Sequence, residues 1–199
     1  EYFAFSASAA YQFSDTFQAY ARYTSGKKAP DFGILSGITT PAAIATIFPS
    51  AEKIQQIEMG LKYRNDGIFI QVFPFWSKNS DIADNQTFTY KAGTPNAGVN
   101  YSPPPVFGQV ETYGIEISGD FDVTRQLNLH ADLTLQNPKS SGFSTYTQGP
   151  KGDGTDDIVS TVPKGTADNN PKIIARATAT YRPVETLSLF ATYSYLGKR

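Results

Sequence analysis

The sequence predicts an all-β fold, an antiparallel transmembrane β-barrel segment of about eight strands with short periplasmic turns and long extracellular loops. Three observations support this prediction. Apolar and polar residues alternate along the predicted strands, aromatic residues reach 14% of the chain while charged residues fall to 18%, and tight polar turns alternate with long stretches rich in Pro and Gly. Period-two alternation and aromatic enrichment both favour strands over helices.

The composition excludes several classes of function. The chain has 199 residues, with 17 Lys and Arg against 18 Asp and Glu, so it offers no basic surface for nucleic acid. It has no Cys and one His, which excludes disulfide scaffolds, thiolate metal sites and thiol catalysis. No stretch reaches the roughly 18 consecutive apolar residues that a membrane-spanning helix needs.

Pro and Gly divide the chain into predicted strand regions and loops. Ser25 to Glu52, Lys78 to Gln109 and Asn137 to Pro171 contain 11 of the 13 Pro and 11 of the 16 Gly. These stretches are predicted to be loops. They are far longer than the usual connection of about 4–6 residues in compact domains, which indicates a function for them.

Four predicted β-hairpins lie before, between and after these loops. Each has two alternating runs joined by a short polar turn. The turns are Ser14-Asp15-Thr16, Arg64-Asn65-Asp66-Gly67, Asp122-Val123-Thr124-Arg125 and Arg182-Pro183-Val184-Glu185. This order of tight turn and long loop is typical of a transmembrane β-barrel, in which periplasmic turns are short and extracellular loops long.

The alternation predicts one lipid-facing and one lumen-facing side of the sheet. Only the strand from Ile68 to Trp76 is ambiguous, because both of its faces are apolar. The polar side carries charges that a dry core would not accept unpaired but that a watery or plugged lumen would. These charged residues are Arg22, Glu58, Lys62, Glu116, Asp120, His130, Asp132 and Arg176.

Aromatic residues on the apolar side form two rows, which are expected to lie at the two membrane interfaces. The row beside the tight turns comprises Tyr11, Phe13, Tyr63, Phe121 and Tyr181. The row beside the long loops comprises Tyr23, Tyr113, Tyr193 and Tyr195.

Three segments resemble TonB-dependent outer-membrane receptors. They are Glu58-Met-Gly-Leu-Lys-Tyr-Arg-Asn-Asp-Gly with its Phe/Trp-rich following strand, Tyr113-Gly-Ile-Glu-Ile-Ser-Gly-Asp-Phe with the strand from Leu127, and the ending Phe190-Ala-Thr-Tyr-Ser-Tyr-Leu-Gly-Lys-Arg. In that family a 22-stranded barrel encloses an N-terminal plug, and TonB energises import from the inner membrane. The resemblance implies a non-enzymatic importer of a scarce nutrient such as a ferric siderophore, vitamin or glycan, in the outer membrane of a Gram-negative bacterium.

The resemblance also implies that residues 1–199 are a C-terminal part of a barrel domain. About eight strands are expected, no plug segment is recognisable, and the chain ends at Arg199 where such barrels typically end in a strand with a terminal aromatic residue. The plug and the remaining strands are therefore expected to be absent from this sequence. Two alternatives remain open: a complete eight-stranded outer-membrane barrel with a structural or adhesive role, and a soluble β-sandwich binding module.

Candidate substrate contacts fall in the loops and on the lumen face. Loop aromatics are suited to stacking on a ligand ring or sugar, and lumen charges to lining its route. The candidates are Phe32, Phe88, Tyr90, Tyr101, Phe107 and Tyr146 in the loops, and Arg22, Glu58 and Arg176 in the lumen. The expected partners are outer-membrane lipid, TonB through the missing plug region, and a small-molecule or glycan ligand.

No catalytic residue, metal site or cofactor is predicted. His130 and Asp132 share the polar face, but no Ser nucleophile elbow accompanies them. The carboxylates of Asp153, Asp156 and Asp157 cluster in a loop without the spacing of an EF-hand.

Overall fold

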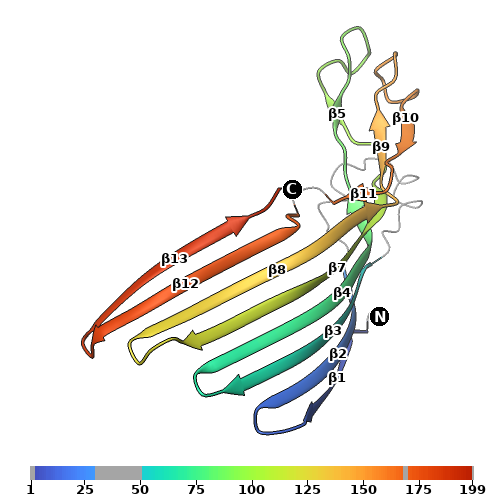
Figure 1. The fold of residues 1–199 in the computed structure, drawn as a ribbon. Coiled ribbons are helices and arrows are strands. Elements are labelled where there is room, and N and C mark those ends of the chain that lie inside the picture. The colour runs from blue at the N-terminus through green and yellow to red at the C-terminus, as the bar shows by residue number, and fades with distance from the viewer. Residues whose placement is uncertain (1–2, 30–50, 168–169, 199) are drawn as a thin grey trace.

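A computed structural model describes residues 3–29, 51–167 and 170–198, and eight long strands dominate it. They form a single antiparallel sheet in the order β1-β2-β3-β4-β7-β8-β12-β13, with neighbours in the sheet following chain order (Figure 1). The strands are β1 (Phe5–Gln12), β2 (Phe17–Lys28), β3 (Glu52–Asn65), β4 (Ile68–Asp84), β7 (Val106–Asp122), β8 (Leu127–Ser141), β12 (Ile173–Val184) and β13 (Leu187–Leu196).

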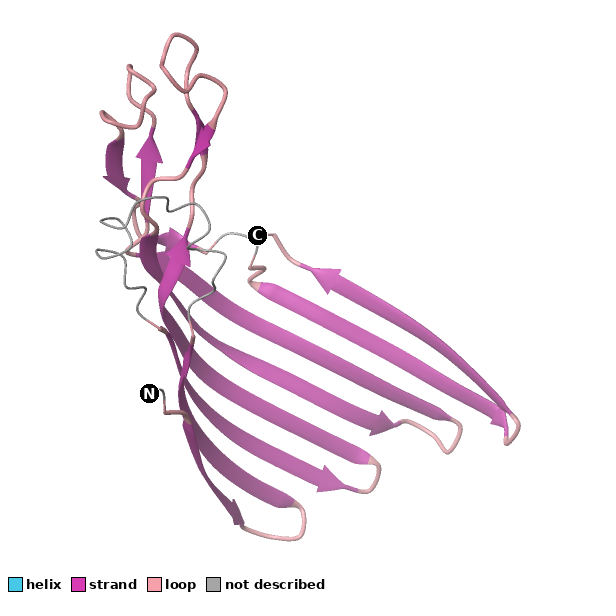
Figure 2. Cartoon of the chain, turned by 180° about the vertical axis from the view of Figure 1, so that it is seen from behind, coloured by secondary structure: helices cyan, strands magenta, loops and turns pink. Residues whose placement is uncertain are grey.

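All four tight turns lie at one end of the sheet (Figure 2). Side chains or backbone geometry stabilise them locally. Ser14 Oγ accepts the N–H of Phe17 at 3.1 Å, and Thr124 Oγ1 accepts the N–H of Leu127 at 3.0 Å. Asp66 and Gly67 have φ values of 33° and 75°, as the two-residue turn between β3 and β4 requires. The fourth turn is later than predicted, because β12 continues through Pro183 to Val184 with a register shift after Tyr181.

The strand registers keep the two predicted faces separate across the whole sheet. Ala21 lies opposite Met59, Leu61 opposite Val72, and Ile117 opposite Leu133, all on the apolar face. The polar face matches Arg22 with Glu58, Asp120 with His130, and Asp132 with Arg176.

The sheet has no protein layer over its apolar face. Among the described residues, Ala167 and prolines such as Pro138 are buried but no large aliphatic or aromatic side chain is, whereas Tyr11 is 66% exposed and Leu189 is 52% exposed. A β-sandwich would bury this face under a second sheet of comparable size, but the only other sheets in the described part of the chain are two two-stranded pairs. The apolar face and its aromatic rows are therefore suited to lipid.

Strand β4, whose faces the sequence leaves ambiguous, is resolved by its register. Val72 and Pro74 lie on the apolar face opposite Ile117 and Ile115 of β7, so Phe73 and Phe75 lie on the lumen face. Rings on that face cover glycines of neighbouring strands. A Cβ on Gly60 would lie 2.0 Å from Cε1 of Tyr20, and one on Gly114 would lie 2.8 Å from Cζ of Phe75. The lumen face is thus partly aromatic, which is why alternation alone does not assign β4.

The strands extend further toward the long loops than the sequence predicts. Lys78–Asp84 and Asn137–Ser141 belong to strands, although the Pro and Gly pattern assigns them to loops. Strands β4 and β7 have 17 residues each, more than the roughly 9–11 that span a membrane. Pro138 lies opposite Thr112 of β7, but its carbonyl accepts the N–H of Ala167 on the other side of β8. On that side the only pairing strand is the two-residue β11 (Gly165–Thr166), so the missing N–H of Pro138 interrupts no long ladder.

The sheet is open at both edges. Among the described strands, β1 pairs with β2 alone and β13 with β12 alone, so these eight strands do not close on themselves as the alternative of a complete small barrel requires (Figure 1). The described residues contain no helix long and apolar enough to cross a membrane.

Candidate ligand-binding site

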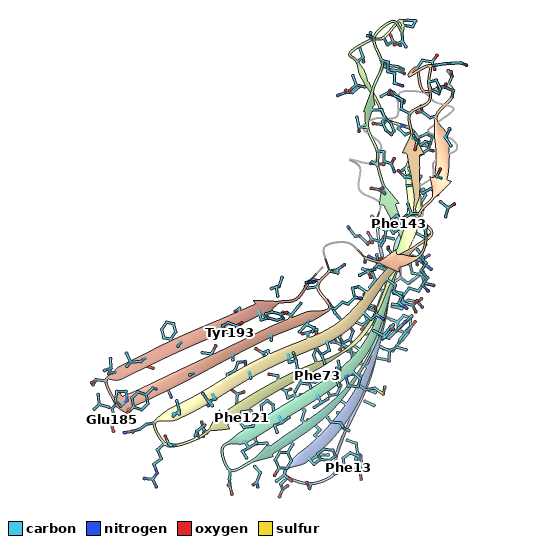
Figure 3. All side chains as sticks on the ribbon, turned by 45° about the horizontal axis from the view of Figure 1, so that its top comes forward. Phe13, Phe73, Phe121, Phe143, Glu185 and Tyr193 are labelled. Atoms are coloured by element: carbon cyan, nitrogen blue, oxygen red, sulfur yellow. The ribbon has the colours of Figure 1, made fainter. Side chains whose placement is uncertain are left out.

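Two hairpins rise from the loop end of the sheet, and we call them the outer hairpins. The first spans residues 85–105 with β5 (Phe88–Thr89) and β6 (Asn100–Tyr101); the second spans residues 142–163 with β9 (Ser144–Thr147) and β10 (Ile158–Thr161). They stand beside each other above the eight-stranded sheet, which we call the wall (Figure 1). Phe143 lies where the second hairpin leaves this sheet (Figure 3). A Cβ on Gly108 would lie 2.4 Å from the Phe143 ring, so the absence of a side chain there admits the ring.

Near the sheet, hydrogen bonds of the Gln86 side chain join the first outer hairpin to the second. Gln86 Oε1 accepts the N–H of Tyr146 at 2.8 Å and the hydroxyl of Thr145 at 3.3 Å. Its Nε2 donates to the carbonyl of Ser144 at 3.3 Å. A single side chain therefore satisfies backbone groups that would otherwise need water.

Further from the wall, a lysine and a tyrosine join the same two hairpins. Lys91 donates from Nζ to the carbonyl of Gly149 and from its backbone N–H to the carbonyl of Gly152, both at 3.1 Å. Tyr101 donates its hydroxyl to Asp157 Oδ2 at 2.7 Å, and Asp157 Oδ1 accepts the N–H of Gly149 at 3.1 Å. The outer hairpins are thus one connected unit.

A cavity of about 600 Å³ opens between the outer hairpins. Its volume falls within the range of about 300–1,000 Å³ that is usual for small-molecule sites. Both hairpins line it, with Tyr90, Asn96, Val99, Asn100, Tyr101, Ser102, Pro103 and Pro104 from the first and Tyr146, Asp153, Gly154, Thr155 and Asp157 from the second.

The aromatic rings of the first hairpin pack in a row beside this cavity. The ring centroids of Tyr90 and Tyr101 are 4.5 Å apart with planes at 33°, and Phe88 lies 5.8 Å from Tyr101 on the strand pair β5–β6. Phe88 itself is not a lining residue. The packing fixes Tyr90 and Tyr101 before any ligand arrives, which lowers the entropy cost of binding.

The protonation states of two lining groups follow from their contacts. Burial, followed by the hydrogen bond to Asp157, raises the pKa of the Tyr101 hydroxyl above its ordinary value, so Tyr101 stays neutral. Hydrogen bonds from the hydroxyl and N–H of Thr155 lower the pKa of Asp153, so its carboxylate is ionised near neutral pH. The cavity therefore presents a neutral phenol and a fixed negative charge.

The lumen face of the wall holds a second set of polar groups, and these pair mainly with one another. Arg22 and Glu58 form an ion pair at 2.5 Å between β2 and β3. His130 lies between two carboxylates, with Nδ1 2.9 Å from Asp120 and Nε2 2.9 Å from Asp132. Such pairs, two of them between strands and the His130–Asp132 contact within β8, keep the lumen face polar without a ligand.

The structure separates the predicted site residues into groups. Tyr90, Tyr101 and Tyr146 meet at one cavity, although 56 positions separate the first from the last. Phe88 packs behind Tyr101, and Phe107 is in β7 opposite Ala83. Arg22, Glu58 and Arg176 are on the lumen face of the wall, where Arg176 lies opposite Asp132. Phe32 lies outside the described residues.

Sequence reasoning did not identify Asn96, Asp153 and Asp157 as cavity residues. The cluster of carboxylates at 153–157 is visible in the sequence, but nothing local indicates that it meets Tyr101. Asp153 Oδ1, Asp156 Oδ2 and Asp157 Oδ1 accept hydrogen bonds from backbone or hydroxyl groups, whereas the buried Asp156 Oδ1 has no hydrogen-bond partner among the described residues. No group of three or more His, Cys, Asp or Glu in the described part of the chain is arranged to hold a metal ion.

Comparison with known proteins gives a consistent family match. The family model described as TonB dependent receptor-like, beta-barrel, matches residues 1–199. No curated protein matches the chain.

Solved structures reproduce the sheet. The closed form of the ferric-catecholate import receptor Fiu from E. coli K12 superposes with a TM-score of 0.60 at 18% identity, over 96% of this chain and 24% of that one. The copper transporter OprC gives 0.59 at 17% identity, over 95% and 25%. The open form of Fiu gives 0.56 at 15% identity, over 97% and 35%. The chain thus spans about a quarter to a third of these receptors, and the likeness concerns the fold and not the ligand.

Proposed function

The chain belongs to the TonB-dependent receptor β-barrel family, and we propose that it is part of an importer of a scarce nutrient such as a ferric siderophore, vitamin or glycan. Members of this family reside in the outer membrane of Gram-negative bacteria and are transporters, not enzymes. The proposal places the tight turns in the periplasm and the outer hairpins outside the cell.

We propose that residues 1–199 form four consecutive hairpins of the barrel domain. The plug and the remaining strands would come from the rest of the receptor, and TonB would act through that plug. The open edges at β1 and β13 support this arrangement, because an unpaired strand edge in hydrocarbon leaves backbone groups unsatisfied. Outer-membrane lipid would cover the apolar face. The near-neutral charge of the chain argues against nucleic acid as a partner.

The observation that carries the proposal is the cavity between the outer hairpins. It stands at the extracellular end, it has the size of a small-molecule site, and three tyrosines converge on it from two separate loops. A nutrient captured there would be held at the mouth of the barrel, above the polar lumen face. The outer hairpins would thus form part of the first binding site on the route inward.

The test is uptake by cells that express the full receptor, with and without TonB. The probes are labelled ferric catecholate, ferric hydroxamate, cobalamin, Cu²⁺ and neutral oligosaccharides. We expect receptor-dependent uptake of one probe class that is lost without TonB. Receptor-dependent uptake that persists without TonB, or uptake of no probe in either strain, would contradict the proposal.

A further inference from the structure

We propose that the cavity between the outer hairpins binds a neutral, hydroxyl-rich ligand of the oligosaccharide type. This inference rests on the proposed function, since it names the ligand class of the same site. It depends on three features of the lining: its charge, its aromatic surface and its hydrogen-bonding groups.

The charge of the lining disfavours anionic ligands. Asp153 and Asp157 are its only charged side chains among the described residues, and neither Lys nor Arg is present there to oppose them. Lys91 and Lys151 lie near the cavity but outside its lining: Nζ of Lys91 donates to the carbonyl of Gly149, and the charge of Lys151 adds to the hydrogen bonds from Thr155 in lowering the pKa of Asp153. A ferric catecholate or another anionic chelate would lose water on entering and would then face charge of its own sign.

The aromatic surface matches the apolar faces of sugar rings. Tyr90 and Tyr101 come from the first outer hairpin and Tyr146 from the second, so a flat ligand can be contacted from both sides. In the described part of the chain the Tyr101 hydroxyl bonds to Asp157 and Gln148, whereas the hydroxyls of Tyr90 and Tyr146 bond to no described residue. Each of these two rings therefore offers an apolar face and a polar edge to a ligand.

The hydrogen-bonding groups favour hydroxyls over an organic cation. Asn96 provides amide donors and an acceptor in the lining. The hydroxyl of Thr155 donates to Asp153 Oδ1 and that of Ser102 is hydrogen-bonded to Thr87, so these hydroxyls add acceptor lone pairs, and Asp153 adds further carboxylate acceptors. A sugar hydroxyl both donates and accepts, so it can use all of these groups. A cation has only donors, and would leave the amide donors of Asn96 without a partner.

The experiment measures binding of the full receptor, purified in detergent, to an array that carries neutral, carboxylated and amino oligosaccharides together with an immobilised ferric catecholate. Three variants accompany the parent. Tyr90→Ala removes an aromatic surface, and Asp153→Lys reverses a charge of the lining. Val159→Ala is the matched control, because Val159 lies in β10 opposite Tyr146 but outside the lining. Heat-modifiable migration of each variant on a gel verifies that the barrel has folded.

We expect the parent to bind a neutral oligosaccharide, Tyr90→Ala to weaken that binding on the order of tenfold, and Val159→Ala to leave it unchanged. Asp153→Lys is expected to move the preference toward carboxylated oligosaccharides. Binding confined to the ferric catecholate, to carboxylated sugars or to amino sugars would overturn the ligand class, as would the absence of any binding. If TonB-dependent uptake of a ferric chelate were observed, the proposed function would stand while this inference would fail.

Discussion

The wall and the outer hairpins are held together by different interactions. In the wall, backbone ladders join neighbouring strands, and side chains divide lipid from lumen and add cross-strand pairs such as Arg22 with Glu58. In the outer hairpins, the joining bonds run from side chains such as Gln86, Lys91 and Tyr101 to partners 56 to 60 residues away. The wall should therefore be sensitive to which face a residue occupies, and the outer hairpins to the loss of single side chains.

The largest effect is expected when a charge is placed on the lipid face of the wall. Ala177→Arg lies near the middle of β12 on the apolar side, opposite Ala131 and Tyr193. We expect it to lower the free energy of unfolding by about 2–4 kcal/mol, since Arg at the bilayer midplane has that cost. Urea titration of the full receptor in lipid vesicles measures it.

The matched control is Thr178→Arg, one residue along the same strand at nearly the same depth. Thr178 lies on the lumen face, opposite His130 and Thr192. Its replacement should have a much smaller effect on unfolding because an Arg there faces the polar lumen. Equal costs at positions 177 and 178 would mean that the lipid face is wrongly assigned.

A second substitution tests close packing within the lumen face. Gly60→Ala would bring a Cβ to 2.0 Å from Cε1 of Tyr20, so the ring must move. Overpacking of this kind typically costs about 1–3 kcal/mol. In the variant Gly26→Ala the new Cβ meets Ala4 Cβ at 3.5 Å, an ordinary contact, and the same titration should show little change. The comparison fails if both glycines tolerate Ala equally.

The face that each residue of the wall occupies can be predicted from the sequence, and the substitutions above depend on that prediction. The face of Ala177 or Thr178 follows from its position in the alternation, because a strand has period two. The same rule does not assign the faces of β4, because Phe73 and Phe75 place aromatic rings on the lumen side. The rule also does not predict where strands end. The stretches in which β4 and β8 extend toward the outer hairpins have a Pro and Gly pattern that resembles that of a loop.

The cavity was predictable only in its residue types. Aromatic residues in long loops indicate a binding role, and Tyr90, Tyr101 and Tyr146 do converge. Their convergence depends on the hydrogen bonds of Gln86 with Tyr146 and of Tyr101 with Asp157. The two residues of each pair are 60 and 56 positions apart in the sequence and belong to different outer hairpins. No local periodicity encodes such pairs, so the contribution of Asp153 and Asp157 to the lining required the structure. The role of Phe32 remains a prediction.

A third prediction concerns the attachment of the outer hairpins to each other. Gln86→Ala removes three hydrogen bonds to the second hairpin. We expect local opening to become easier by about 1–3 kcal/mol, because a polar backbone group loses its partner. Amide hydrogen exchange at Tyr146 measures this change.

The control for that experiment is another glutamine at the opposite end of the molecule. Gln126 Nε2 donates to the carbonyl of Pro183 at 3.2 Å beside a tight turn. Gln126→Ala should leave the exchange of Tyr146 unchanged, and neither variant should alter the urea titration of the wall. A loss of wall stability in Gln86→Ala would show that the outer hairpins and the wall unfold as one unit.

The smallest effect is expected from alkaline pH. Burial and the hydrogen bond to Asp157 raise the pKa of Tyr101 above its ordinary value of 10.0 while the hairpins are joined. The joined state therefore binds this proton more tightly than the open state, and its added stability is complete below pH 10. It is lost as the pH rises from 10 through the raised pKa, because the open form then gives up its proton first.

Spin labels at Thr94→Cys and Val159→Cys would report the separation of the hairpins, which should widen over that range. In Tyr101→Phe the hydrogen bond is missing at every pH, so the separation should show no such step. If Tyr101→Phe kept the same alkaline step as the parent, another group would control the opening, and Tyr101 would be only a packing residue beside the cavity.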